Sequence, residues 1–388
     1  MITREILREI ADFQANNADA ITFYYQPVTP QDHSHRQETI LVKDLVKENM
    51  RRSERSGKNG TVRADLERIL TLAERLHGNQ GRAKAIFACG AQNYWREIDF
   101  PTRAVPFTKL SMNSRFHLAP LSAALGESLQ KTCVCLVDRS RARFFLLEGQ
   151  RISEAEGFVD ELSRPRTDGF EGYNAGHVER KLDNEAVSHF KRVAEKLLER
   201  YTGDCCDKVL IGCRDELWPA IEKQLHPYVK QRLIGQFLID PAITSPEEVR
   251  QHAVQAVRNS RELHRANVLG EVLDEARANN RGALGLRRVL RAMEQGEVQV
   301  LLLASDLAAE GVECTNCGHI DIRMVHQCAV CGQQTRVIED LPETLIGKAL
   351  RSGIEVMHIP ASDDFRKAGN IGALLRFRAD RSVGGKLA

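Results

Sequence analysis

The amino-acid sequence predicts a multidomain protein of mixed α/β and α+β type, built from three domains. Three observations support this prediction. A chain of 388 residues is long for a single hydrophobic core, so several domains are expected. The middle of the chain alternates strand-like and helix-like segments in the order of a mixed sheet covered by helices. The last third has the same alternation, interrupted by a short segment with four closely spaced cysteines.

The composition narrows the class of protein further. Hydrophobic residues make up 42% and charged residues 28% of the chain, which is typical of a folded, water-soluble protein. The formal net charge of +2 is close to zero, so any attraction to nucleic acid must come from local basic clusters. The sequence has neither an apolar run of membrane-spanning length nor a charged and apolar leader, so we expect a cytoplasmic protein with no membrane partner.

Six of the ten cysteines lie outside the closely spaced group, mostly in apolar, strand-like surroundings. Thiols of this kind are usually buried and free in a cytoplasmic protein. This prediction applies to Cys89, Cys133, Cys135, Cys205, Cys206 and Cys213.

The first domain is expected to cover residues 1–129 and to be of α+β type. Its helices are predicted from amphipathic patterns at residues 1–8, 39–52 and 62–76. Its strands are predicted from β-branched and aromatic runs at residues 20–27 and 83–89. Prolines punctuate the remaining segments, including 117–121, for which we expect an extended backbone. A basic stretch at residues 43–58 is interpreted as a solvated helix face and loop rather than an RNA-binding patch.

The second domain is expected to cover residues 130–243 and to begin with a β-hairpin. Two apolar strands, 132–138 and 142–149, are joined by a short connection. Alternate residues at its tip are arginines: Arg139, Arg141 and Arg143. They lie on one face if strand geometry continues there, and they are candidates for contacts with phosphate groups.

A long connection, residues 150–181, follows the hairpin and leads to a helix that we expect to begin near Asp183. It contains the glycine-rich sequence 169–180. Irregular connections of this length are uncommon and are usually functional. The candidates for RNA contacts in it are Arg164, Arg166, Gly172, Tyr173, Asn174, Gly176, His177 and Arg180. Acidic and basic residues balance between 139 and 181, so only local clusters favour phosphate binding.

The helix after this connection carries an apolar stripe from Ala186 to Leu198, and we expect His189 to lie off the stripe. Strand, helix and strand patterns follow at residues 208–212, 218–225 and 232–240. The third domain, residues 244–388, is expected to be of α/β type. Its helices are predicted at 245–279, 284–294 and 342–351, and its strands at 298–304, 354–359 and 371–377.

Two Cys-x-x-Cys turns, each followed by glycine, lie within residues 312–333. Each turn directs two thiolates at one point, and the glycine lets the turn open its amide groups toward the sulfurs. Four thiolates saturate a tetrahedral zinc and leave no position for water or substrate. We therefore predict a structural Zn²⁺ in a zinc ribbon at residues 312–333, rather than disulfides or an iron–sulfur cluster. The predicted ligands are Cys314, Cys317, Cys328 and Cys331, whereas His319 and His326 are interpreted as exposed loop residues.

The sequence resembles a known family. The strand Val300-Leu301-Leu302-Leu303, the four-cysteine segment, a helix, the strand Ile354-Glu355-Val356 and the closing Gly-x-Ile-x-Ala-x-x-Arg-aromatic pattern of residues 369–377 resemble the C-terminal domain of the archaeal and eukaryotic class 1 release factors and Pelota. The middle of the chain resembles the central domain of the same superfamily. The sequence Gly172-Tyr173-Asn174-Ala175-Gly176-His177 ahead of an Asn-Glu helix is similar to the bacterial branch of this family, in the group numbered ten.

The resemblance implies a translation factor. Such a protein enters the ribosomal A site among ribosomal RNA and tRNA, meets a translational GTPase such as elongation factor Tu with its third domain, and reaches toward the peptidyl-transferase centre with its central domain. In the release factors the central loop carries a Gly-Gly-Gln that orients water at the peptidyl-tRNA ester. Here Gly149-Gln150, Gly235-Gln236 and Gly332-Gln333 each lack the preceding glycine. The favoured hypothesis is ribosome binding, in rescue or hibernation, without Gln-dependent hydrolysis.

Two alternatives stay open at this point. His177 is a candidate base, and Asn174 or Tyr173 a candidate for positioning an ester, which would make the protein a peptidyl-tRNA hydrolase or peptide release factor. The sequence offers no nucleophile in a defined setting, and we favour the interpretation that His177 and Asn174 shape the loop or contact RNA. The other alternative is an adaptor that uses the zinc ribbon for protein contacts away from the ribosome.

Overall fold

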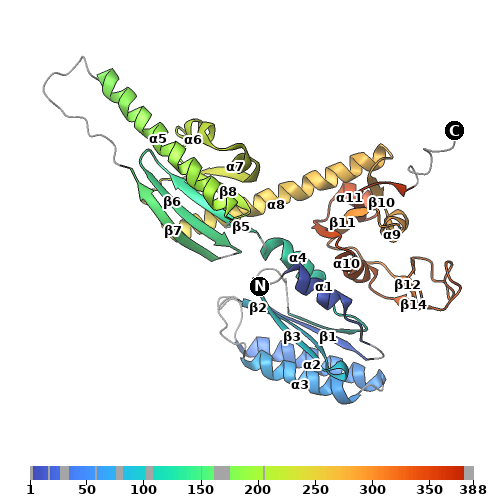
Figure 1. Ribbon diagram of the computed structural model, residues 1–388. Coiled ribbons are helices and arrows are strands. Elements are labelled where there is room, and N and C mark those ends of the chain that lie inside the picture. Colours follow the sequence, from blue (N-terminus) through green and yellow to red (C-terminus); the bar gives the residue numbers. More distant parts are fainter. Residues whose placement is uncertain are drawn as a thin grey trace, which may run out of the picture. The chain divides into compact units, whose positions relative to one another are not determined.

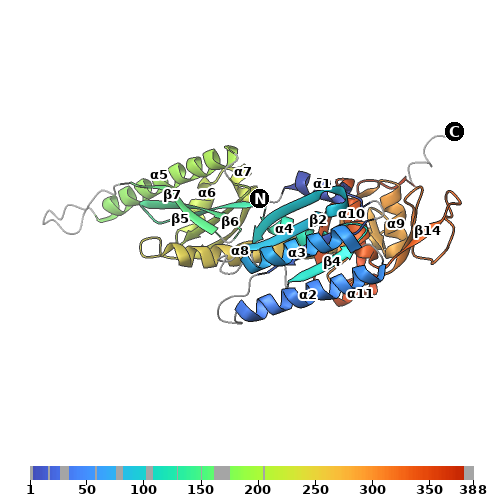
Figure 2. The ribbon, with the colours of Figure 1, turned by 90° about the horizontal axis from the view of Figure 1, so that it is seen from below.

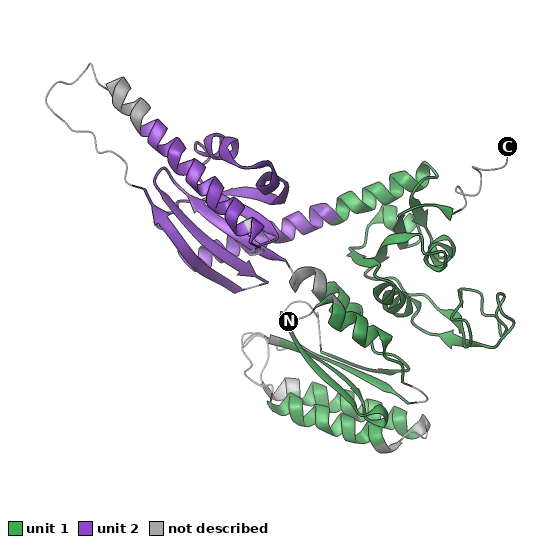
Figure 3. Ribbon diagram, in the orientation of Figure 1, with its two compact units in different colours: residues 1–128, 265–388 green, residues 129–264 purple. Residues whose placement is uncertain are grey.

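The chain forms two compact units, residues 1–128 together with 265–388, and residues 129–264 (Figure 3). We call them the discontinuous unit and the central unit. The computed structural model describes residues 3–15, 18–26, 35–56, 59–75, 82–101, 108–128, 130–149, 151–160, 175–203 and 206–379. The finer division into three domains at residues 129 and 243 stays a prediction.

The N-terminal part of the discontinuous unit is a four-stranded antiparallel sheet between two layers of helices (Figures 1 and 2). Its strand order is β3-β2-β1-β4. The strands are β1 (Ala20–Tyr25), β2 (Arg82–Cys89), β3 (Tyr94–Pro101) and β4 (Lys109–Asn113), with a 3-10 turn η1 (Gly90–Gln92) between β2 and β3. The helices are α2 (His35–Ser56) and α3 (Asn59–Arg75) on one face, and α1 (Arg4–Asp12) and α4 (Ala119–Ser128) on the other.

Strand β1 shows why this sheet is covered on both sides. Its alternate residues face opposite cores, as a strand period of two requires. Phe23 packs with Leu66 of α3 in one core, and Tyr24 packs with Leu7 of α1 in the other. All six residues of β1 are therefore buried.

The C-terminal part of the discontinuous unit contains a second sheet of four strands, in the order β10-β16-β11-β15. Its strands are β10 (Gly282–Leu284), β11 (Val298–Ala304), β15 (Glu355–Ile359) and β16 (Ile371–Leu375), and β11 pairs in parallel with β15 only. The helices are α9 (Leu286–Glu294), α10 (Leu341–Arg351) and α11 (Asp363–Lys367). A small antiparallel sheet, β13-β12-β14, consists of β12 (Gly311–Cys314), β13 (Ile320–Asp321) and β14 (Thr335–Ile338).

One hydrophobic core joins the two parts of the discontinuous unit. It contains Leu7 of α1 and Leu121 of α4 together with Leu345 and Ala349 of α10. Residues separated by more than two hundred positions in the sequence therefore share one buried cluster, and neither part completes this core alone.

The central unit is a mixed five-stranded sheet in the order β7-β6-β5-β8-β9. Its strands are β5 (Lys131–Val137), β6 (Arg141–Glu148), β7 (Arg151–Val159), β8 (Lys208–Cys213) and β9 (Leu233–Leu238). Helices α5 (Ala175–Thr202), α6 (Trp218–Gln224) and α7 (Pro227–Arg232) pack on the face that carries Cys135. The first part of α8 (Pro246–Arg277) packs on the other face, where Val249 and Ala253 contact the core around Leu136.

The mixed α/β character and most long elements are confirmed, including the β5–β6 hairpin. The structure also confirms buried, free thiols at Cys89, Cys133, Cys135, Cys206 and Cys213, whereas Cys205 lies outside the described residues. No helix among the described residues has the length and hydrophobicity that a membrane span requires.

Four predictions about local structure are wrong. Part of the connection 150–181 is the strand β7, which alternates poorly because it is an exposed edge strand. Helix α5 begins at Ala175, eight residues before the predicted start at Asp183, in a stretch whose glycines disfavour a helix locally. The segment 117–121 enters helix α4 instead of staying extended. His189 is buried rather than off the apolar face, because Asp160 supplies a polar partner there.

Candidate metal centre and the stem of the long connection

The four cysteines predicted as metal ligands converge on one point. Their Sγ atoms all lie within 4.8 Å of one another. Cys314 Sγ is 3.4 Å from Cys331 Sγ, and Cys317 Sγ is 3.7 Å from Cys328 Sγ. A tetrahedral ion with metal–sulfur bonds of about 2.3 Å needs sulfur–sulfur separations of about 3.8 Å. The four thiols therefore have the arrangement of a closed four-sulfur metal site.

Backbone amides stabilise the thiolate form of these cysteines. The amides of Asn316 and Cys317 donate to Cys314 Sγ at 3.4 and 3.5 Å, and the amide of Val330 donates to Cys328 Sγ at 3.4 Å. The glycines that close the two turns, Gly318 and Gly332, have φ values of 69° and 74°, which side chains other than hydrogen tolerate poorly. Both Cys-x-x-Cys turns thus direct amide groups at the sulfurs.

Backbone amides also lower the pKa of two of these thiols. A hydrogen bond from the backbone of Cys317 lowers the pKa of Cys314 below its ordinary value. A hydrogen bond from the backbone of Gln333, aided by the neighbouring thiols, lowers the pKa of Cys331 to about 6. The backbone of His319 also donates to Cys317, but hydrogen bonding to Cys331 and burial outweigh this bond and raise the pKa of Cys317 to about 12. Thiolates are the metal-binding form of cysteine, so the environment favours the thiolates of Cys314 and Cys331, whereas a metal must displace the proton of Cys317.

The segment that carries the cysteines is fixed to the rest of the discontinuous unit. Ile320 of β13 and Ile338 of β14 belong to the large hydrophobic core. His319 Nδ1 lies 2.6 Å from Glu294 Oε1 at the end of α9. His319 is therefore engaged with a carboxylate, and among the described residues the group that could hold a metal consists of the four cysteines.

The arginines at the hairpin tip fall into different environments. The tip itself is ordered by Asp138, whose Oδ1 accepts hydrogen bonds from the amides of Ser140 and Arg141, each at 2.7 Å. Arg139 is exposed, with Nη1 3.8 Å from Asp183 Oδ1 of α5. Arg141 lies at the start of β6, two residues from Arg143 and hence on the same face of the strand.

Arg143 is committed to the fold. Its Nε and Nη2 donate to the Glu154 carboxylate at 2.7 and 3.1 Å. Its Nη1 donates to the carbonyls of Pro241 and Thr244 at 3.2 and 2.9 Å. These bonds tie β6 to β7 and to the segment before α8, so Arg143 is a structural residue more than a phosphate contact.

A polar cluster that the sequence did not reveal, here called the stem, lies at the end of β7. Asp160, which follows β7, places Oδ2 2.6 Å from His189 Nδ1 and accepts a hydrogen bond from Arg192 through Oδ1. The Asp160 amide donates to the carbonyl of Ser140 at 2.7 Å. The stem thus joins the hairpin tip, the end of β7 and helix α5. His189 and Arg192 share one helix face at a spacing of three, but their partner lies far away in sequence.

The remaining predicted site residues are placed only in part. Gly176, His177 and Arg180 lie in the first turns of α5. Arg164, Arg166, Gly172, Tyr173 and Asn174 lie outside the described residues.

Two comparisons show which known proteins the chain is similar to. The chain is 24% identical over 404 residues to peptide chain release factor subunit 1 of Archaeoglobus fulgidus, with 96% of each chain covered. The chain is thus similar to a release factor along almost its whole length. Residues 117–258 match the sequence model of bacterial archaeo-eukaryotic release factor family 10.

Three solved structures are also similar to this chain. The crystal structure of the archaeal translation termination factor aRF1 is 17% identical, with 97% of this chain and 99% of that chain covered and a TM-score of 0.26. Archaeoglobus fulgidus Pelota is 15% identical, with 76% and 80% covered and a TM-score of 0.37. A ribosome-bound archaeal Pelota with ABCE1 is also 15% identical, with 76% and 78% covered and a TM-score of 0.41.

Proposed function

We propose that this protein is a ribosome-associated factor that binds the A site in ribosome rescue or hibernation, without Gln-dependent hydrolysis. One observation carries the proposal: residues 117–258 match the sequence model of a bacterial archaeo-eukaryotic release factor family. The sequence of the chain has no Gly-Gly-Gln, and for this reason the proposal does not include Gln-dependent hydrolysis. The matched segment includes the hairpin, the stem at Asp160 and helix α5, and in this proposal residues 161–174 correspond to the loop where release factors carry that motif. The contacts are proposed to involve Arg139, Arg141, Arg164, Arg166, Gly172, Tyr173, Asn174, Gly176, His177 and Arg180.

Co-sedimentation with bacterial ribosomes tests the proposal. Wild-type protein is expected to sediment with ribosomes at low salt, and the logarithm of its association constant should fall linearly with the logarithm of salt concentration because phosphate contacts release counterions. Arg139→Ala should weaken binding and flatten this dependence. Arg258→Ala is the matched control, since Arg258 is an exposed arginine of the same unit, paired with Glu262 on α8. Wild-type protein that stays free of ribosomes at low salt contradicts the proposal.

Peptide release distinguishes the catalytic alternative. Ribosome complexes stalled with a peptidyl-tRNA are expected to keep their peptide when the wild-type protein is added. Release by the wild type that is lost in His177→Ala or Asn174→Ala would instead establish a peptidyl-tRNA hydrolase.

We further infer that the C-terminal part of the chain contacts a translational GTPase such as elongation factor Tu. A binding assay with the purified GTPase tests this directly. Retention of cellular proteins without ribosomal RNA would favour the adaptor alternative.

We also propose that the four-cysteine cluster holds a structural Zn²⁺. The donor set fits: four thiols converge, amides point at the sulfurs, and no further side chain is needed to complete a tetrahedron. Elemental analysis of the purified protein should give one zinc per chain. Cys328→Ser should lose the metal, whereas Cys89→Ser, a change at a buried thiol outside the cluster, should retain it.

A further inference from the structure

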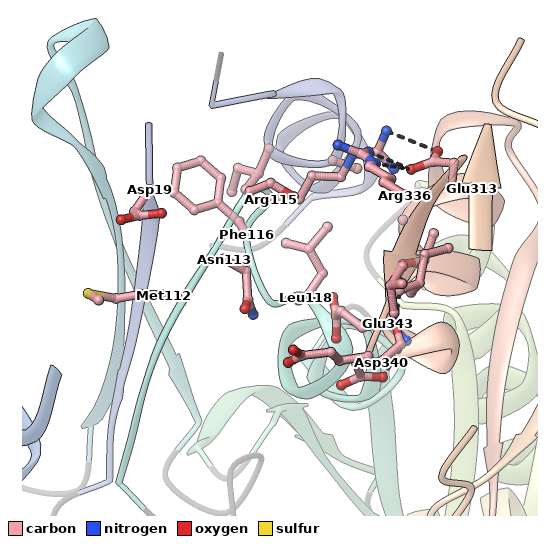
Figure 4. Close-up of a pocket in the computed structure, with 18 of the residues that line it drawn as sticks. Asp19, Met112, Asn113, Arg115, Phe116, Leu118, Glu313, Arg336, Asp340 and Glu343 are labelled. Atoms are coloured by element: carbon pink, nitrogen blue, oxygen red, sulfur yellow. Dashed lines mark hydrogen bonds and ion pairs between the residues drawn. The ribbon is translucent and has the colours of Figure 1, made fainter. Parts of the chain in front are cut away.

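A cavity of about 540 Å³ lies in the discontinuous unit and is not used by the proposed function (Figure 4). Its walls come from α1, the segment between β4 and α4, the small sheet and α10. Arg115 and Arg336 meet Glu313 at one end, Asp340 and Glu343 lie toward the other, and Phe116 and Leu118 lie between them. Cavities that bind small molecules have volumes of about 300–1,000 Å³.

The arginine end of the cavity has fewer carboxylates than guanidinium groups. Glu313 is buried and accepts hydrogen bonds from Arg115 Nη2 at 3.3 Å and from Arg336 Nε at 3.0 Å. A third arginine, Arg351, donates from Nη1 to the carbonyl of Ala11 at 2.8 Å, which is an uncharged acceptor. Burial and the positive charge of Arg115 lower the pKa of Arg351, against the opposing charges of Asp12 and Glu313. Three guanidinium groups thus share one carboxylate, that of Glu313, at this end of the cavity.

The acidic groups at the other end are already engaged. Both Glu343 oxygens accept hydrogen bonds from the first amides of α4, and Oε2 also lies 2.7 Å from His117 Nδ1. Asp340 accepts a hydrogen bond from the Glu343 amide at 3.0 Å and caps α10. Arg52, Asp19 and Glu339 also line the cavity. Arg115 Nε is buried and has no hydrogen-bond partner among the described residues, so the arginine end of the cavity has a donor ready for a new acceptor.

We propose that this cavity binds a phosphorylated small molecule of the nucleotide class, with its phosphates at Arg115, Arg336 and Arg351. A guanidinium fork matches phosphate oxygens in two parallel hydrogen bonds. Inorganic phosphate would leave most of the volume empty, whereas a nucleotide fills it and places its ring beside the exposed side chain of Val337. The carboxylates of Asp340 and Glu339 offer acceptors for hydroxyl or amino groups of the ligand.

Calorimetric titration of the full-length, metal-loaded protein with ADP and with GDP tests this proposal. At least one nucleotide is expected to bind, with pyrophosphate weaker and adenosine or guanosine weaker still. Absence of binding by both nucleotides at millimolar concentration overturns the proposal. Pyrophosphate binding as tight as that of the nucleotides would show a site for anions only, and nucleoside binding as tight as that of the nucleotides would show that the arginines do not recognise phosphate. Both results contradict it.

Two substitutions with opposite expected effects locate the site. Arg336→Gln removes a charged donor and should weaken nucleotide binding by about tenfold or more. Glu313→Gln frees two guanidinium groups from their carboxylate and should strengthen binding. Arg323→Gln is the control, because Arg323 is an exposed arginine paired with Asp321 outside the cavity. Unchanged affinity in Arg336→Gln, or equal weakening in Arg336→Gln and Glu313→Gln, contradicts the assignment.

Discussion

Single side chains decide which charges remain available at the candidate sites. The sequence predicts Arg143 as a phosphate contact together with Arg139 and Arg141. In the structure its guanidinium group donates hydrogen bonds to Glu154 and to two backbone carbonyls instead. The sequence spacing places Arg141 and Arg143 on one face of β6, as the structure does. It cannot reveal the partners of Arg143, which lie up to 101 positions away in the sequence. Local charge patterns thus identify candidates, and tertiary partners decide among them.

The stem residue Asp160 should matter for stability. Asp160→Ala leaves the buried His189 ring without its carboxylate and should lower the free energy of unfolding by about 1–3 kcal/mol. Urea unfolding followed by circular dichroism measures the change. Asp183→Ala is the control, because its pair with Arg139 is exposed and 3.8 Å long, and it should change stability by less than about 1 kcal/mol. Equal effects of both substitutions would show that the stem contributes nothing.

Metal retention should depend on pH through the cysteines. The pKa of Cys331 is lowered to about 6, so the stabilisation of its thiolate is complete above the ordinary thiol pKa and is lost as pH falls through about 6. Protons then compete with the metal for the sulfurs. A chromophoric chelator should detect little release of zinc at neutral pH and increasing release below pH 6. Release that is independent of pH over this range would contradict the prediction.

At the scale of elements, helix α4 explains a failed prediction. Pro120 favours an extended backbone for the segment 117–121, and no residue just before Ala119 supplies a side-chain cap. The cap comes instead from Glu343 of α10, whose carboxylate accepts from the amides of Leu118 and Ala119. A cap supplied from a distant element leaves no local signal, whereas long helices such as α8, with its own Ser245 cap, were predicted well.

Removing the distant cap gives a test. Glu343→Ala leaves two amides of α4 and the His117 ring without their acceptor and should lower stability by about 2–4 kcal/mol. Thermal unfolding of the full chain measures this loss. Glu339→Ala, at an exposed position four residues earlier in the sequence, should leave the melting temperature nearly unchanged. A comparable loss in both variants would show that the cap is unimportant.

The cysteine pattern shows the opposite case. Cysteine spacing, turn glycines and sulfur convergence all follow from a short contiguous motif, so the sequence predicts the cluster with all four of its cysteines. The small sheet that supports it was not predicted, because strands of two to four residues carry too little periodicity.

At the scale of the whole molecule, we expect the central unit to fold on its own and the N-terminal part of the discontinuous unit not to do so. Residues 129–264 contain a complete sheet with a core on each face and should fold as an isolated fragment. Residues 1–128 alone would expose Leu7 and Leu121, which pack against Leu345 in the full chain. Heteronuclear NMR spectra should therefore be dispersed for the first fragment and poorly dispersed for the second. A well-folded fragment 1–128 would show that the shared core is dispensable.

The origin of the α4 cap also has a consequence for protein synthesis. Leu118 and Glu343 are 225 residues apart, and the ribosome makes Leu118 first. At a synthesis rate of about 5–20 residues per second, roughly ten to forty-five seconds pass before the carboxylate exists. During that interval the central unit can complete its sheet. The core residues of the first 128 positions, such as Leu7 and Leu121, stay exposed until α10 has been synthesised. Nascent chains of this protein are thus expected to need protection at their beginning for longer than at their middle.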